Sequence, residues 1–277
     1  MFQHLDLRGR CKRLVAVGAA GALWAGVGFG QVGLGLSPMR LELAIGPGAV
    51  HSGGLSIRNE GDAPTRIRAE VLDFQIDSTA TPQFSREMAT EADYTCRKWL
   101  TVNPMEIEIG PQRGSLVRYT FRVPPSASPR SYHCAVGFSS LPTADPTNGS
   151  GIRAAVRVVA AFYLVVGDPK IEGEIRDVTL ESATGVPGHP WRAVVTIRNS
   201  GRRYFRPEGE LALIDADSKV VTQSSFPSLP VLPDRDQRFL FPLSVEPTGK
   251  LTLRARVGMG HGEIQEALVP VVLSKAP

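Results

Sequence analysis

The stretch Leu55-Ser56-Ile57-Arg58-Asn59-Glu60-Gly61 alternates apolar and polar residues and then ends in turn-forming ones. A period of two is typical of a half-buried β-strand, and an Asn followed two positions later by Gly favours a tight turn. We therefore expect Ile57 to point into a core and Arg58 to point outward. The same pattern returns as Ile197-Arg198-Asn199-Ser200-Gly201, which indicates an internal repeat.

The repeat extends further along the chain. The turn Gly110-Pro111-Gln112-Arg113 precedes an alternating segment that starts at Leu116, and Leu232-Pro233-Asp234-Arg235 precedes a similar one that starts at Arg238. Other short alternating segments fill the chain, at Leu41–Ile45, Ile67–Phe74, Met105–Ile109, Tyr132–Phe138 and Leu251–Val257. No helical period persists beyond two turns. The sequence thus predicts an all-β protein with two immunoglobulin-like β-sandwich domains in tandem.

The predicted domains cover residues 36–167 and 170–277, with a hinge at Gly167-Asp168-Pro169-Lys170. The polar region Asp77–Thr95 lacks periodicity, so we expect a long loop there, with one helical turn near Glu87–Asp93. A length of 277 residues is enough for two domains that each bury a core.

The first 30 residues have the order of parts of a signal peptide: a basic start, the apolar run Leu14–Phe29, and small residues at Gly28 and Gly30. We expect cleavage after Gly30 or after Gly35, export to an oxidising compartment, and no membrane span in the mature chain. The alternative is a membrane anchor, for which the run is short. This segment holds +3 of the formal net charge of +4, so the mature chain is nearly neutral, which argues against nucleic acid as a partner.

Cys96 and Cys134 remain after removal of this segment. In an oxidising compartment such a pair tends to form a disulfide, and we predict one here. The alternative is two small core residues that never meet. The histidines are scattered without metal-ligand spacing, so we expect no metal and no cofactor.

Motifs of catalysis are missing from the sequence, which contains neither a G-x-S-x-G elbow nor a P-loop. Gly258-Met259-Gly260-His261-Gly262 follows a predicted strand without opening a helix, so we interpret it as a hairpin turn. We expect a protein that is not an enzyme, and a hydrolase is a remote alternative.

The chain resembles the periplasmic pilus-assembly chaperones (PapD-like) from Leu36 to about Pro169. The resemblance rests on the exported start before Ser37-Pro38-Met39-Arg40-Leu41-Glu42-Leu43, the segment 55–61, the Ile109-Gly110-Pro111 turn, and a long apolar strand before a Pro. It implies two immunoglobulin-like domains set at an angle. The implied partners are exported pilus-type or surface protein subunits and an outer-membrane usher.

In that family the last strand of the first domain is lent to an incomplete subunit by β-strand addition. Here the corresponding segment is Ile152–Val166, with one face apolar throughout. The resemblance implies subunit-binding side chains at Ile152, Ala154, Val156 and Val158. The alternative is an ordinary core strand, buried on one side and then on both.

The family also holds the terminal carboxylate of a subunit with an Arg from the first strand and a Lys from this last strand, which is a charge-assisted arrangement. Arg40 stands at the position of the Arg. No Lys lies between Lys98 and Lys170, so the second cation is absent.

The resemblance as a whole implies a noncatalytic, chaperone-like binder of exported subunits that assists their folding and assembly. The alternative is a structural or adhesive immunoglobulin-like module of a cell-surface assembly.

Overall fold

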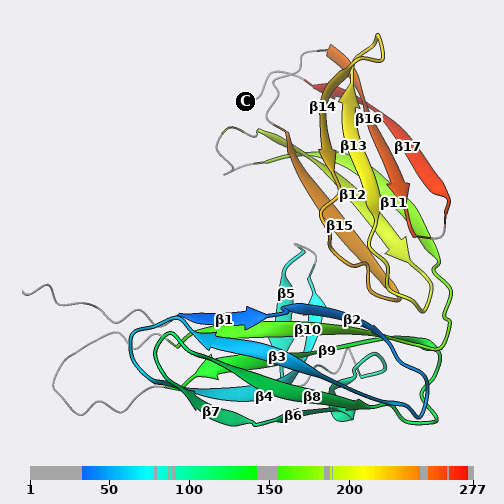
Figure 1. Cartoon of the computed structure of the whole chain (residues 1–277). Helices are drawn as coiled ribbons and strands as arrows, with labels where there is room; N and C mark the ends of the chain where they lie inside the picture. Colours follow the sequence, from blue (N-terminus) through cyan, green and yellow to red (C-terminus); the bar gives the residue numbers. More distant parts are fainter. Residues whose placement is uncertain are drawn as a thin grey trace, which may run out of the picture. The chain divides into compact units, whose positions relative to one another are not determined.

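The computed structural model describes residues 33–77, 80–86, 88, 92–141, 155–183, 188, 190–243, 249–260 and 262–273. The described chain is built almost entirely of β-strands, arranged as two β-sandwiches (Figure 1). This confirms the predicted fold class. The proposed signal peptide and its Gly30 cleavage site lie outside the described residues. No helix in the described ranges is long and apolar enough to cross a membrane.

The first sandwich consists of β1 to β10. One sheet has the order β1-β3-β8-β6, and the other has the order β2-β10-β9-β4-β5, with β7 also paired to β4. The strands are β1 (Leu34–Ser37), β2 (Arg40–Ala44), β3 (Val50–Asn59), β4 (Thr65–Ile76), β5 (Pro82–Ser85), β6 (Leu100–Asn103), β7 (Glu106–Ile109), β8 (Gly114–Arg122), β9 (Arg130–Ser140) and β10 (Arg157–Val166).

The second sandwich consists of β11 to β17, with sheets of order β11-β12-β15 and β14-β13-β16-β17. The strands are β11 (Gly173–Ser182), β12 (Trp191–Asn199), β13 (Glu208–Ile214), β14 (Val220–Ser225), β15 (Arg235–Leu243), β16 (Gly249–Gly258) and β17 (Ile264–Leu273). The predicted hairpin after Gly258 is present, because β16 and β17 pair antiparallel from Gly258 and Ile264 onward.

Both sandwiches share one strand order. In the first, β4 pairs with β9, which pairs with β10, and in the second, β13 pairs with β16, which pairs with β17. The strand before β4 is β3, which joins the opposite sheet and pairs with β8. In the same way β12, the strand before β13, joins the opposite sheet and pairs with β15. This alternation of the chain between two sheets is the topology of immunoglobulin-like domains.

The repeated Asn makes the same buried contacts in both copies. Asn59 Nδ2 donates to the carbonyl oxygens of Ala63 (2.7 Å) and Ile109 (3.0 Å), and its Oδ1 accepts from Gly61 N at 2.9 Å. Asn199 Nδ2 donates to Arg203 O (2.9 Å) and Val231 O (3.0 Å), and its Oδ1 accepts from Gly201 N at 3.0 Å. Each Asn therefore closes one turn and ties it to a second loop.

The second loop of each repeat also has the same backbone conformation in both copies. Gln112 and Asp234 each follow a Pro and have positive φ values of 57° and 56°. A Pro followed by a residue with positive φ is typical of a type II turn. The two sequence motifs thus meet in space, at one end of each sandwich.

We expect Asn59→Ala to lower the free energy of unfolding of the first sandwich by about 3 kcal/mol, because it leaves buried backbone groups without partners. Asn59 is fully buried. Urea unfolding followed by tryptophan fluorescence would measure the change. Ser56→Ala, an exposed position on the same strand, is the matched control and should change stability by less than about 0.5 kcal/mol. A loss for Asn59→Ala as small as that of the control would contradict the role given to this residue.

One prediction for the first sandwich was wrong. The region Asp77–Thr95 is not only loop, because Pro82–Ser85 forms β5 and pairs with Asp73–Ile76 at the end of β4. Phe84 packs against Phe74, with ring centroids 5.5 Å apart, and this apolar contact holds the short strand in place. The helical turn expected near Glu87–Asp93 includes residues outside the described ranges, and the short 3₁₀ helix lies later, at Arg97–Trp99.

The predicted disulfide is present between Cys96 and Cys134, whose Cα atoms are 5.3 Å apart. Cys134 lies in β9, and Cys96 immediately precedes the 3₁₀ helix. Both residues are fully buried in the core of the first sandwich. The disulfide therefore fastens the segment before β6 to the central strand of the opposite sheet.

Candidate functional site

The outer edge of β10 is only partly paired. On one side β10 pairs antiparallel with β9 along its whole length, from Arg157 to Val166. On the other side it pairs parallel with β2, but only from Ala161 to Val165 (Figure 1). Among the described strands, none pairs with the outer edge of the first four residues, Arg157–Ala160.

The hydrogen bonds at the end of this pairing show which backbone groups face the open edge. Ala161 N donates to Met39 O, and Val165 O accepts from Ile45 N, so the odd-numbered residues of β10 face β2. Val156 O accepts from Ser140 N, so the even-numbered residues face β9. Because backbone groups alternate along a strand, the N–H and C=O groups of Arg157 and Val159 point to the open edge.

The side chains of β10 lie on two different surfaces. One face carries Val156, Val158, Ala160, Phe162, Leu164 and Val166, all of which contact the core of the first sandwich. The other face carries Val159, Ala161 and Tyr163, which join a smaller apolar cluster around Phe74 and Leu72. The strand is therefore apolar on both faces beyond Arg157.

The subunit-binding residues expected from the resemblance are placed as follows. Val156 and Val158 are half-buried and pack against the core from the open-edge end of β10. Ile152 and Ala154 lie outside the described residues. The half-exposed side chains of Val156 and Val158 thus border the unpaired backbone, and a strand added there would cover them.

Arg40 is the first residue of β2, opposite Ala161 of β10. Its side chain is 52% exposed, and its Nε lies 3.5 Å from Glu42 Oε1. Arg40 Nη1 also donates a long hydrogen bond of 3.4 Å to Ser228 Oγ. The guanidinium of Arg40 therefore stands beside the point where the pairing of β10 with β2 begins.

Sequence reasoning missed a second guanidinium near Arg40. Arg206 Nε donates to Glu42 Oε1 at 3.0 Å, so Glu42 contacts both arginines. Arg206 Nη1 donates to Ser228 O at 2.7 Å, and its guanidinium carbon lies 5.1 Å from the centroid of the Tyr163 ring. Its side chain is only 15% exposed. Arg206 thus places a second, largely buried guanidinium beside Glu42, although it comes from a distant part of the sequence.

Two tyrosines complete these surroundings. The rings of Tyr163 and Tyr204 lie 5.2 Å apart. Burial raises the pKa of the Tyr163 phenol above its usual value, and the Arg206 guanidinium opposes this shift. Burial, followed by the nearby Glu42 carboxylate, also raises the pKa of Tyr204. Both phenols are therefore neutral at physiological pH. Their rings pack as apolar surfaces, and their hydroxyl groups remain available for hydrogen bonds.

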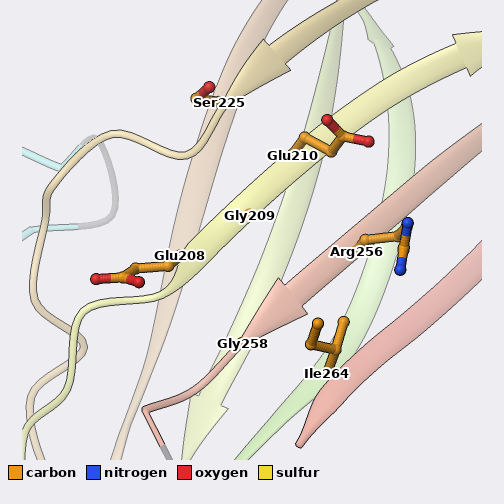
Figure 2. Close-up of a pocket in the computed structure, with 7 residues that line it drawn as sticks. All are labelled: Glu208, Gly209, Glu210, Ser225, Arg256, Gly258 and Ile264. Atoms are coloured by element: carbon orange, nitrogen blue, oxygen red, sulfur yellow. The ribbon is translucent and has the colours of Figure 1, made fainter. Parts of the chain in front are cut away.

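A separate hollow lies on the second sandwich, where Glu208 and Glu210 of β13 stand beside Arg256 of β16 and Ile264 of β17 (Figure 2). Gly209 separates the two acids with a φ of 145°, and a Cβ there would lie 2.0 Å from Arg256 O. The close approach of β13 to β16 therefore requires glycine. The carboxylates of Glu208 and Glu210 point in different directions, so they do not converge on a common point.

Within the described residues, no group of three or more His, Cys, Asp or Glu side chains is placed to hold a metal ion. The hollow offers two carboxylates beside one guanidinium, whereas the edge of β10 offers unpaired backbone groups beside apolar side chains and the guanidinium of Arg40. These groups suit the binding of a polypeptide.

Comparisons with family models and with curated proteins find no match. Among solved structures, the chain is similar to the class 5 fimbriae chaperone CfaA, with 10% identity and a TM-score of 0.46 over 86% of this chain and 99% of that one. It is similar to the E. coli chaperone DraB, with 16% identity and a TM-score of 0.42 over 87% and 98%. It is also similar to the Pseudomonas aeruginosa CupB2 chaperone, with 14% identity and a TM-score of 0.42 over 84% and 97%.

Proposed function

We propose that the mature chain is a periplasmic, noncatalytic chaperone that binds exported pilus-type subunits by pairing a subunit strand with the open edge of β10. The observation that carries the proposal is the outward-facing, unpaired backbone of Arg157 and Val159 at the end of a strand that is otherwise paired on both sides. An apolar strand with a free edge is a template for another strand.

The neighbouring side chains support strand addition at this place. Val156 and Val158 are half-buried at the rim of the core, so an added strand would bury their remaining apolar surface. Each square ångström of apolar surface removed from water contributes about 25 cal/mol. Arg157, by contrast, is held by Glu70 at 3.0 Å and marks the charged start of the edge. In this proposal Ile152 and Ala154 extend the same binding surface.

Arg40 fixes the register of the bound strand. Its exposed guanidinium lies beside the end of the open edge and faces one carboxylate, Glu42, which it shares with Arg206. A terminal carboxylate of a subunit would give Arg40 a charge-assisted partner at this point. In this proposal the two guanidiniums of Arg40 and Arg206 take the place of the Arg and Lys with which the family holds a terminal carboxylate.

The mature chain is proposed to begin at Gln31 rather than after Gly35. Leu34 is buried in the core, and Leu34–Ser37 pairs with β3 as β1. Cleavage after Gly35 would remove half of this strand, whereas cleavage after Gly30 leaves it whole. N-terminal sequencing of the exported protein should therefore read Gln31-Val32-Gly33, and a mature start at Leu36 would contradict the proposal.

The capture experiment uses the mature chain with a photo-crosslinking residue at Arg157 and, as a matched control, at exposed Gln223 of β14, which lies outside the hollow. Both forms are exposed to periplasmic extract of the source cells, and the crosslinked proteins are identified by mass spectrometry. We expect an exported subunit with an incomplete β-sandwich to be crosslinked at position 157 alone. Equal crosslinking at both positions, or a chain that stays a free monomer with no crosslinked subunit, would favour the structural or adhesive module instead.

We expect Arg40→Ala to weaken binding of the captured subunit by about 10-fold to 100-fold, since a hydrogen bond to a charged group contributes about 1.5–3 kcal/mol. Arg68→Ala is the matched control, because Arg68 is an exposed arginine of the same sheet that pairs with Glu106. Isothermal titration with the purified subunit would measure both. A subunit that lacks its terminal carboxylate should bind both proteins equally, and an unchanged affinity of Arg40→Ala for the intact subunit would rule out this role.

A further inference from the structure

The outward face of the sheet β1-β3-β8-β6 carries three arginines, two of which make no ion pair with a described residue. Along β3, β6 and β8 the side chains alternate between the core and the outside, and the outward positions include Arg58, Arg118 and Arg122. All four strands of this sheet are described, and none of their outward positions holds an aspartate or a glutamate. A face of one sign attracts ligands of the opposite sign.

The opposite sheet of the same sandwich shows the contrast. There Arg66 and Arg68 both pair with Glu106 at 2.7 Å, and Arg157 pairs with Glu70 at 3.0 Å. Arg118 and Arg122 make no ion pair with any described residue. Their charges are therefore available to a partner.

Arg58 differs from the other two arginines of this face. A Cβ on Gly35 would lie 3.6 Å from Arg58 Cβ and 2.8 Å from Glu60 Oε1, so the Glu60 carboxylate lies beside Arg58. The uncompensated charge of the face is thus centred on Arg118 and Arg122.

Hydroxyl groups fill the space between these two arginines. Thr120 lies between them on β8, opposite Ser52 of β3 and Thr101 of β6. Ser52 Oγ and Thr120 Oγ1 are 2.8 Å apart and share a hydrogen bond. Thr101 Oγ1 donates to Thr120 O at 3.3 Å, so one hydroxyl hydrogen of the Ser52–Thr120 pair remains for a ligand. Two guanidiniums beside a hydroxyl donor suit the oxygens of a phosphate group.

Two exposed apolar side chains border the same charges. Leu116 is 69% exposed and lies two positions before Arg118, and Val50 is 64% exposed and lies opposite Arg122. A free phosphate ion gains nothing from contact with apolar side chains, whereas a lipid surface offers both anionic headgroups and an apolar layer beneath them.

We propose that this face docks on a membrane surface rich in anionic phospholipids, with Arg118 and Arg122 on the headgroup phosphates and Leu116 and Val50 at the interface. The edge of β10 belongs to the other sheet of the sandwich. Membrane docking and strand pairing therefore use different surfaces, and this inference does not depend on the proposed function.

The test is sedimentation of the mature chain with vesicles of phosphatidylglycerol and phosphatidylcholine in equal parts, and with vesicles of phosphatidylcholine alone. We expect binding to the anionic vesicles only, with a loss at high salt. Arg118→Gln/Arg122→Gln should lower the partition coefficient by about 25-fold, since each basic residue near an anionic surface contributes about a factor of five. Leu116→Ser should weaken binding without changing its salt dependence.

Lys219→Gln/Lys250→Gln is the matched control, because both lysines are exposed on the second sandwich and their removal lowers the net charge equally. The control should bind anionic vesicles as the unaltered protein does. Equal binding to both kinds of vesicle, an equal loss in the control, or full inhibition by inorganic phosphate at millimolar concentration with no effect of Leu116→Ser would each overturn the proposal.

Discussion

A Val159→Pro variant is expected to lose binding of its subunit by about 100-fold or more while the first sandwich stays folded. The N–H of Val159 points to the open edge rather than to β9, as the bonds of Ala161 and Val156 on either side show. Proline removes an N–H and places its ring at that position, so it is tolerated at an edge but blocks the addition of a strand. Titration with the purified subunit and thermal unfolding together measure the two effects.

Val158→Pro is the matched control for this variant. The N–H of Val158 points to β9, so proline there removes a hydrogen bond of the sheet itself and should destabilise the sandwich. Substitutions of the side chains are less selective, because Val156 and Val158 also pack against the core and a charge there costs stability as well as binding. Retention of full affinity in a folded Val159→Pro variant would show that this edge is not used.

Replacing both cysteines of the Cys96–Cys134 disulfide with alanine is expected to lower the free energy of unfolding of the first sandwich by about 3–4 kcal/mol. The disulfide closes a loop with a sequence separation of 38 residues, and the chain-entropy account assigns roughly this stabilisation to such a loop. Urea unfolding of the oxidised protein, the reduced protein and the double variant would measure it.

The second sandwich provides the internal control, since it contains no cysteine. Its unfolding transition should not respond to reduction. Cys134 lies opposite Phe162 of β10 in the sheet, so loss of the disulfide should also loosen the strand that carries the open edge. If the double variant were as stable as the oxidised protein, the disulfide would have no part in holding this region.

Local patterns in the sequence were sufficient to predict features that depend only on residues close together in the chain. The alternation around Ile57 and the Asn-x-Gly turn after it predict the end of a strand and its turn, and the structure contains both, with the same contacts in each copy. The short strand β5 escaped detection because Pro82-Gln83-Phe84-Ser85 has only one apolar side chain to reveal it.

The candidate site depends on contacts that no local pattern contains. Arg206 contacts Glu42 across 164 positions of sequence, and nothing in the sequence near Arg206 distinguishes this largely buried arginine from the exposed ones. The apolar alternation of β10 is visible in the sequence, but the open edge is not. That edge depends on where β2, more than a hundred residues earlier, begins to pair.

Amide hydrogen exchange along β10, with and without the captured subunit, tests the central claim most directly. In the free protein the amide of Val159 faces the open edge, whereas the amide of Ala160 faces β9. Strand addition should slow exchange at Val159 and Arg157 strongly and leave the already protected amide of Ala160 nearly unchanged. Exchange at Val159 that is equally fast with the subunit bound would contradict the account.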